Sequence, residues 1–290
     1  MNKYKKTIKC LYDAAVNTIE HDGIEHAGYM AFLSIVSLFP FMVFIVALTG
    51  AIGETAIGTK FIHFIQESLP KNISYALEPR IHEIISGPPE GLLTLAIFGA
   101  IWTASSSVEG LRTILNRVYL DTTPPPYILR RLLSIFQFLL LTVIIIIATL
   151  ILILVPIIYE KIFGLNFFDN QFFILRDFLT NLAPAWYYIR YFLLEIILFF
   201  VVCTIYFIVP NTKLKLNSVM AGAFIVVVLW SIAGSLLSNY LKNFKQVNFI
   251  YGSLGGIIAS LIFFYIMNMI LIYGAEFNYL FDKHVLKEKA

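Results

Sequence analysis

Four polar residues in the segment "WTASSSVEGLRTILNRVY" could act together. They are separated by four, three and four positions, and they are Ser105, Glu109, Arg112 and Asn116. Residues at this spacing share one face of a helix, so the sequence predicts a polar stripe. Arg112 in such a stripe could hold a phosphate or a carboxylate by two parallel hydrogen bonds. The alternative is the solvated face of a helix that leaves the membrane, with Arg117, Arg130 and Arg131 as ordinary basic flanks.

The three consecutive serines Ser105, Ser106 and Ser107 do not indicate a nucleophilic enzyme. Three successive helical residues spread over about 200° of the helix surface, so they cannot converge on one reacting atom. No Gly-x-Ser-x-Gly elbow surrounds them, and the sequence shows no HExxH, CxxC or Walker motif. We therefore expect no catalytic residues, no metal site, no cofactor and no enzyme activity. The serine hydroxyls are expected to bond the carbonyls one turn back, at 101–103.

The composition indicates an integral membrane protein. Of the 290 residues, 59% are hydrophobic and 13% are charged, and the mean hydropathy is +0.81. Soluble domains carry about 25% charged residues, so this chain is too apolar to remain in water. The net charge of +3 is too small to indicate a nucleic-acid partner. Membrane lipids, anionic ones in particular, are the expected partners, and a homo-oligomer is left open.

Six apolar stretches are long enough to cross a bilayer, because a hydrocarbon core of ~30 Å requires about 20 helical residues. Runs such as "LLLTVIIIIATLILILV" are apolar all round, which is typical of helices and not of barrel strands. The sequence therefore predicts an all-α integral membrane protein with a single six-helix transmembrane domain at 28–280. The predicted spans are about 28–50, 91–108, 132–158, 190–209, 217–238 and 252–274.

Lysine and arginine are more frequent in the two terminal segments and in the second and fourth connections than in the other connections. The positive-inside rule then places both termini in the cytoplasm, including the tail at 281–290. Amphipathic stretches at 59–87 and 167–192 are expected to lie on the outer surface as interfacial helices.

The N-terminal segment 1–27 is expected to form a basic amphipathic helix. Its lysines lie opposite an apolar face that contains Ile8, Leu11, Ala15 and Ile19. Such a helix would lie on an anionic inner leaflet.

Polar groups and helix breaks inside a membrane are costly, so they mark candidate functional positions. Pro40 lacks a backbone donor and frees the carbonyl of Val36, which predicts a kink. Ser34 and Ser37 share one face beside it, and the hydroxyl of Ser37 could bond a freed carbonyl. The alternatives are a simple kink repaired by serine and a kink that lines a transport pathway.

Two carboxylates are candidates for proton coupling. Glu195 lies five residues after Arg190, so it could face the interior of the bundle or form an ion pair at the surface. Glu276 lies near the inner end of the last span. Pro210 and Asn211 are expected to end the fourth span and begin a short inner loop, with Pro210 as a helix kink. Asn268 is expected to make an interhelical hydrogen bond.

Three small residues at intervals of four begin the last span, and they are Gly252, Gly256 and Ser260. A small-xxx-small pattern allows two helices to approach closely. Close helix packing is the expected role, and an anion site at the start of a glycine-rich helix is the alternative.

The chain resembles the YihY/virulence factor BrkB family. The similar segments are "GYMAFLSIVSLFP", "SSSVEGLRTILNRVY", "IYFIVPN", "AGAFIVVVLW", "YGSLGG" and "YGAEFNYL", in this order over roughly residues 10–282. The resemblance implies six helices in a bacterial cytoplasmic membrane. Members were once labelled ribonuclease BN, and others are associated with virulence, serum resistance or envelope lipid transport, so no settled catalytic residues can be transferred.

These features lead to three hypotheses. The first is a transporter or flippase for an amphiphilic, anionic envelope lipid or lipid-linked molecule, with Arg112 at the headgroup and Ser34, Ser37 and Ser105 along the path. The second is a scaffold without transport activity that recruits envelope or virulence partners. The third is a membrane-embedded hydrolase or ribonuclease.

Overall fold

The computed structural model describes residues 3–51, 90–120, 125–164, 186–212, 214–243 and 253–286. Within these ranges the chain forms helices and no strand, which confirms the all-α class. The helices are α1 (Lys3–Glu20), α2 (Gly23–Ala51), α5 (Glu90–Val118), α6 (Tyr127–Gly164), α8 (Trp186–Ile208), α9 (Leu216–Asn243) and α11 (Ser253–Phe281), followed by the short π-helical turn η2 (Asp282–Leu286).

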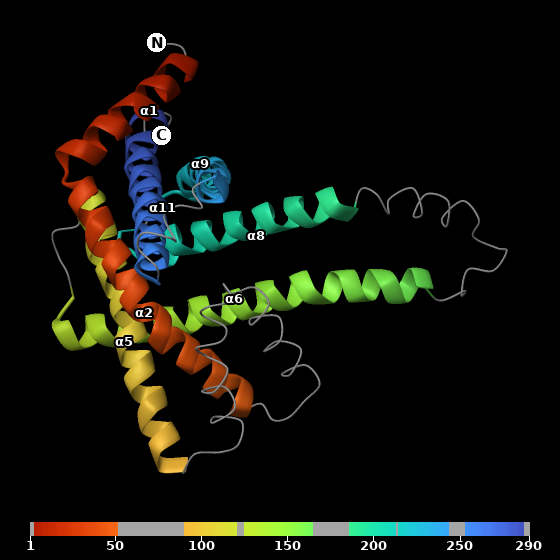
Figure 1. Ribbon diagram of the computed structural model, residues 1–290. Coiled ribbons are helices and arrows are strands. Elements are labelled where there is room, and N and C mark those ends of the chain that lie inside the picture. Colours follow the sequence, from red (N-terminus) through yellow and green to blue (C-terminus); the bar gives the residue numbers. More distant parts are fainter. Residues whose placement is uncertain are drawn as a thin grey trace.

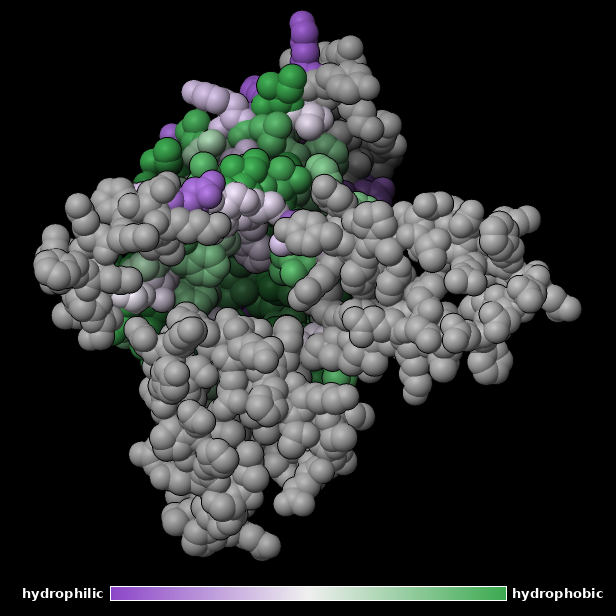
Figure 2. All heavy atoms as spheres, turned by 45° about the vertical axis from the view of Figure 1, so that its right-hand side comes forward, coloured by the Kyte–Doolittle hydropathy of each residue, from purple (hydrophilic) through white to green (hydrophobic). Residues whose placement is uncertain are grey.

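Helices α2, α5 and α11 run side by side, and α9 packs against α11 (Figure 1). Helices α6 and α8 lie next to each other and extend away from this group at a steep angle. Helix α1 lies at one end of the bundle and contacts the C-terminal part of α11 (Figure 1). The described surface in Figure 2 is mainly apolar, and its hydrophilic residues lie mostly toward the end that carries α1.

Five helices in the described part of the chain are long and apolar enough to cross a membrane, which supports a multi-pass membrane protein. They are Gly23–Met42, Tyr127–Ile151, Tyr191–Ile208, Leu216–Tyr240 and Gly255–His284. The remaining predicted span is 91–108, the second in chain order. It falls in α5, which is not among these five helices. The predicted interfacial helix at 59–87 lies outside the described residues, as does 167–185 of the second one.

Helix α1 packs against the bundle with a face that the hydrophobic pattern did not predict. Its buried residues are Cys10, Ala14 and Thr18, which follow one another at intervals of four. Cys10 and Ala14 form a small apolar cluster with residues of α11. In contrast, Ile8 and Ile19 of the predicted apolar face are 66% and 64% exposed. One face of α1 therefore contacts the protein, while a second apolar face stays uncovered.

This packing makes Cys10 a reporter of the α1–α11 contact. Burial, aided by nearby Asp13, raises the pKa of the Cys10 thiol, and each pKa unit lowers the reactive thiolate fraction about tenfold. In a Cys203→Ser background, we expect Cys10 to react with a maleimide much more slowly than a cysteine placed at exposed position 8. The comparison protein carries Ile8→Cys and Cys10→Ser. Equal labelling rates in the folded protein would contradict the packing of α1.

Helices α9 and α11 cross closely at Gly222 and Gly274. A Cβ on Gly222 would lie 2.6 Å from the carbonyl oxygen of Gly274 and would also overlap the Asn278 side chain. Among the described residues, no helix packs closely at Gly256, because a Cβ there would meet nothing within 4 Å. Ser260 only donates back to the carbonyl of Gly256, and Gly252 lies outside the described residues.

Helix α2 continues through Pro40 as one α-helix. Ser34 donates to the carbonyl of Met30 at 2.8 Å, and Ser37 donates to the carbonyl of Ser34 at 3.2 Å. The Ser37 hydroxyl therefore bonds the carbonyl of Ser34 and not the carbonyl of Val36, which Pro40 frees. The predicted interhelical bond of Asn268 is present, since its amide donates to the Ser34 hydroxyl at 3.4 Å.

Candidate functional site

The predicted polar stripe of α5 is buried against other helices. Ser105, Arg112 and Asn116 are 0%, 1% and 9% exposed. These three residues therefore face neither water nor lipid, whereas Glu109, the fourth residue of the stripe, lines an open cavity. Arg112 and Asn116 bond to α6 and to the turn that follows α8, while Ser105 donates to the carbonyl of Trp102 within α5.

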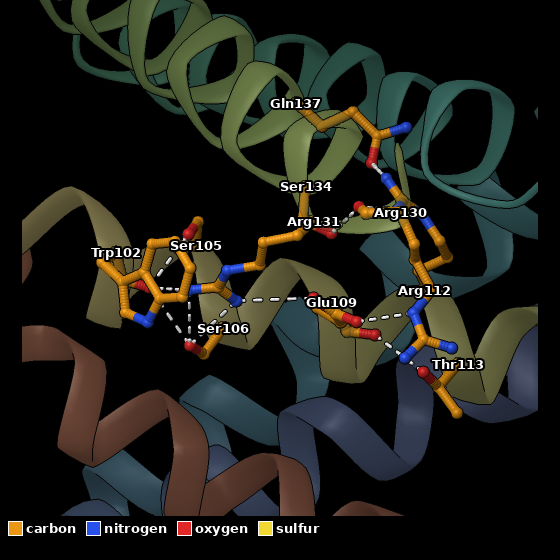
Figure 3. A network of polar contacts seen from close by, with 10 residues as sticks. All are labelled: Trp102, Ser105, Ser106, Glu109, Arg112, Thr113, Arg130, Arg131, Ser134 and Gln137. Carbon is orange, nitrogen blue, oxygen red and sulfur yellow. Dashed lines mark hydrogen bonds and ion pairs between the residues drawn. The ribbon is translucent and has the colours of Figure 1, made fainter. Parts of the chain in front are cut away.

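Arg112 joins three segments of the chain. Its Nε donates to the carbonyl of Val209 at 3.2 Å, and Nη1 donates to the carbonyl of Arg130 at 2.8 Å. Its Nη2 donates to Oε1 of Gln137 on α6 (Figure 3). Gln137 in turn donates to the carbonyl of Ile208 at 2.6 Å, at the last residue of α8. Because its N–H groups are used within the protein, Arg112 is not placed to hold a headgroup.

Asn116 extends this support to the turn after α8. Its Oδ1 accepts a hydrogen bond from the backbone N–H of Asn211 at 2.9 Å. Pro210 ends the helix rather than kinking it, because α8 stops at Ile208. The predicted stripe is thus a structural anchor for the α8–α9 connection.

A second polar face of α5 is formed by Ser106, Glu109 and Thr113, which lie about one turn apart. Glu109 accepts from Nε of Arg130 at 2.7 Å and from Nη1 of Arg131 at 3.4 Å (Figure 3). Both arginines belong to the first turns of α6, so the start of that helix folds back over α5.

The Arg131 guanidinium lies 4.2 Å from the centre of the Trp102 ring, a cation–π geometry. It donates from Nη1 to the Ser106 hydroxyl at 3.2 Å and from Nη2 to the carbonyl of Trp102. Arg131 is only 7% exposed, yet its Nε has no hydrogen-bond partner among the described residues. A buried N–H of a charged group without an acceptor is costly, so the contacts of the other two guanidinium nitrogens and of the Trp102 ring must hold Arg131 in place.

The hydroxyls of the serine triplet are used locally. Ser105 and Ser106 both donate to the carbonyl of Trp102, at 3.0 and 3.1 Å. Ser107 instead donates to the carbonyl of Leu33 on α2, at 3.1 Å. The expected bonds to residues 101 and 103 are therefore replaced by a shared acceptor and by a contact between helices.

An open cavity of about 520 Å³ lies between α2, α5 and the start of α6. Its lining residues are His26, Tyr29, Ser106, Glu109, Gly110, Thr113, Ile114, Tyr127 and Arg131. Gly110 allows α2 to come close, because a Cβ there would lie 2.6 Å from Cδ1 of Leu33. The single carboxylate of the lining is already paired with Arg130 and Arg131, so the cavity favours negative charge.

The α1–α2 turn lies beside this cavity and is held by charged groups. Arg117 of α5 donates to the Asp22 carboxylate at 2.8 Å and lies 3.2 Å from Nε2 of His26, which lines the cavity. On α11, the fully buried Glu276 accepts from Nδ1 of His21 at 2.7 Å. Glu276 is therefore positioned at the junction of the α1–α2 turn with α11.

Glu195 occupies a different part of the bundle. Its Oε1 accepts a hydrogen bond from the Ser231 hydroxyl of α9 at 2.6 Å. The side chain of Arg190 is outside the described residues, so the expected surface ion pair remains a prediction. The structure thus separates the two carboxylates onto different helix contacts.

The sequence reasoning missed the two residues that give the cavity its character, Arg131 and His26. Arg131 was interpreted as an ordinary basic flank, and His26 was not among the residues singled out from the sequence. The sequence feature that could have indicated Arg131 was Glu109, because the two oxygens of a buried carboxylate require hydrogen-bond donors. Only the folding of α6 over α5 shows that these donors come from 130 and 131.

Together, the all-helical fold and the apolar helices define a multi-pass membrane protein. Residues 14–290 match the family described as virulence factor BrkB, and the chain belongs to this family.

Relatives with similar sequences cover nearly the whole chain. The ribonuclease-like protein YfkH of Bacillus subtilis (strain 168) is 30% identical over 263 residues, 91% of each chain. A UPF0761 membrane protein of Alteromonas mediterranea is 20% identical over 280 residues, 96% of this chain and 89% of the relative. A UPF0761 membrane protein of Pseudoalteromonas atlantica is 24% identical over 279 residues, 92% of this chain and 84% of the relative. No solved structure matches the chain significantly.

Proposed function

We propose that this protein is a transporter or flippase for an amphiphilic, anionic envelope lipid or lipid-linked molecule. The observation that carries the proposal is the open cavity lined by Arg131, at which the two cations Arg130 and Arg131 surround the single carboxylate of Glu109. Two of the three helices that line it, α2 and α6, are apolar enough to cross a membrane. An amphiphile could therefore place its headgroup in the cavity while its chains remain against apolar helix surfaces.

This proposal assigns the headgroup contact to Arg131 in place of Arg112. Ser106, Glu109 and Thr113 would line the headgroup site. Ser34 and Ser37 of α2 would lie along the path, as first inferred from their spacing. Glu195 or Glu276 would couple transport to protons.

We infer that the protein lies in the bacterial cytoplasmic membrane with six spans. Five are the apolar helices named above, and the other is 91–108 in α5. Both termini would be cytoplasmic, with interfacial helices in the outer connections and α1 on the inner leaflet. This orientation follows from the basic residues of the sequence. It would open the cavity toward the inner leaflet, where anionic lipid headgroups are found.

Arg131→Gln is expected to reduce the movement of a labelled anionic phospholipid between the leaflets of reconstituted vesicles. The glutamine keeps a polar side chain but removes the charge, and a charge-assisted hydrogen bond is worth roughly a tenfold change in affinity or more. Arg117→Gln is the matched control, because Arg117 is 57% exposed and its ion pair lies outside the cavity lining. Thermal unfolding of each variant separates loss of transport from loss of fold.

Wild-type protein that moves no anionic phospholipid, over a range of pH values and lipid compositions, would contradict the transport function. Equal transport by the wild type and Arg131→Gln would remove the cavity from the mechanism.

A scaffold is the second candidate, because α1 leaves Ile8, Tyr12 and Ile19 exposed. It predicts that deletion of the N-terminal segment abolishes the cellular phenotype while Arg131→Gln preserves it. The ribonuclease-like name of the Bacillus relative suggests a third activity, which would require an RNA product formed by the purified protein.

A further inference from the structure

We propose that His21 carries protons between the surrounding water and the buried carboxylate of Glu276. This inference rests on the proposed function, because it selects Glu276 over Glu195 as the carboxylate that couples transport to protons. It follows from the contrast between a fully buried acid and the partly exposed histidine that bonds to it.

Glu276 lies near the end of α11 and is closed off from water. The residue is 0% exposed. Its Oε1 accepts a hydrogen bond from Nδ1 of His21 at 2.7 Å, whereas its Oε2 is buried and has no hydrogen-bond partner in the described structure. A buried charge needs a partner that compensates it, and here the basic partner is this single histidine. A proton that reaches or leaves the acid therefore has His21 as its nearest carrier.

His21 connects this acid to water. Its side chain is 43% exposed, in contrast to 1% for the side chain of Glu276. Because Nδ1 is bonded to the acid, Nε2 on the other side of the ring is left to meet water. Histidine is the side chain whose charge ordinarily changes between pH 5 and 8, and it serves as a proton shuttle for this reason.

The transfer balances with water as the only other participant. A proton from water binds Nε2 of the neutral imidazole, and the proton on Nδ1 passes along the hydrogen bond to Oε1 of Glu276. The imidazole of His21 is then neutral again, with its proton on Nε2, and the carboxylate has become a neutral carboxylic acid. The reverse sequence returns the proton to water.

The other titratable groups do not offer such a route. Among the described residues, Tyr119 at the end of α5 is the second electrostatic neighbour of Glu276, and burial raises the pKa of Tyr119 above its ordinary value of about 10. The phenol therefore keeps its proton at neutral pH. Glu195, the other candidate for coupling, accepts from the hydroxyl of Ser231, which does not titrate in this range.

The pair is placed where its charge can affect the cavity. His21 precedes the α1–α2 turn, and His26 at the start of α2 lines the cavity. Arg117 of α5 holds the same turn through Asp22 at 2.8 Å and lies 3.2 Å from Nε2 of His26. Protonation of Glu276 removes the charge that fixes His21, so it loosens the turn that positions this wall of the cavity.

Infrared difference spectroscopy follows the proposed proton directly, through the C=O stretching band of a protonated carboxyl group. Full-length protein in nanodiscs receives protons from a caged acid opened by a laser pulse, and the rise of the Glu276 band is timed. Glu276→Gln identifies this band, because glutamine keeps the shape and cannot form it. His21→Gln should slow the rise by roughly a hundredfold, the lower end of what a positioned acid–base group contributes. Glutamine can still donate a hydrogen bond to Glu276 but cannot relay a proton.

Three controls separate proton transfer from a structural role. In the Cys203→Ser background, slow maleimide labelling of Cys10 checks that α1 stays docked in His21→Gln. His284→Gln changes an exposed histidine of η2 and should keep the wild-type rate. Added imidazole should restore the rate in His21→Ala, because the free ring carries protons without joining α1 to α11.

An equally fast rise in the wild type and His21→Gln would overturn the role of His21. A faster rise in His21→Gln, together with rapid labelling of Cys10, would show that the histidine only shields the acid. Wild-type protein without a Glu276 band, over the pH range in which histidine titrates, would reduce the pair to a structural contact. In each case phospholipid movement by the same protein decides the proposed function separately. Proton transfer as expected without lipid movement would contradict the proposed function alone.

Discussion

Arg112→Ala is expected to destabilise the protein by about 3 kcal/mol or more, because it leaves buried hydrogen-bond acceptors without donors. The acceptors are the carbonyls of Val209 and Arg130 and the side-chain oxygen of Gln137. Burial lowers the pKa of Arg112, yet an arginine with an ordinary value above about 12 stays charged at neutral pH. The variant thus removes charge-assisted bonds that hold the α8–α9 connection.

Arg117→Ala is the matched control on the same helix. Its ion pair with Asp22 joins two side chains that are each more than half exposed, and such surface pairs contribute about 0–1 kcal/mol. Thermal unfolding in detergent should therefore separate the two variants clearly. If Arg112→Ala unfolds like the wild type but no longer binds anionic lipid, Arg112 contacts the headgroup and the structural role is wrong.

Much of the fold could be predicted because membrane helices follow from composition and length. The apolar runs predicted the helical class, and Pro210 predicted the end of α8 within two residues. Helix ends of this kind depend on local sequence. The interhelical bond of Asn268 was also predicted, because an amide in the middle of an apolar helix requires a partner.

The partners of the polar stripe could not be predicted in the same way. A stripe of serine, glutamate and arginine on α5 has the same spacing whether it faces water, lipid or another helix. Its surroundings depend on how α6 crosses α5 and where α8 ends, which are tertiary contacts. The sequence therefore identified Arg112 as a polar residue of interest but not its partners, which are two backbone carbonyls and Gln137.

The packing face of α1 shows the same limit. The larger hydrophobic residues Ile8 and Ile19 were predicted to face the membrane surface, and the pattern did not identify Cys10 and Ala14 as the side that packs against the bundle. Small side chains allow the helix axes to approach closely, and close approach stabilises helix pairs where lipid is the alternative neighbour. Hydrophobicity alone does not distinguish a protein-facing from a lipid-facing side.

Gly222→Ala is expected to destabilise the protein by roughly 1–3 kcal/mol, the range for overpacking in a well-packed core. The added methyl would lie 2.6 Å from the Gly274 carbonyl, a backbone atom that cannot move aside without shifting α11. It would also displace Asn278, whose own carbonyl accepts from the Ser218 hydroxyl. The effect therefore spreads from one methyl group to the whole α9–α11 contact.

Gly234→Ala on the same helix supplies the control with the opposite sign. A Cβ at 234 meets nothing within 4 Å, and alanine exceeds glycine in helix propensity by about 1 kcal/mol. Gly256→Ala on α11 should likewise be neutral or stabilising, because its surroundings are also open. Unfolding of the three variants in one detergent ranks the sites directly. The opposite ranking, in which Gly256→Ala loses more stability than Gly222→Ala, would contradict this prediction. It would indicate that the small-residue stripe of the last span forms the principal helix contact, most simply between two copies of the chain.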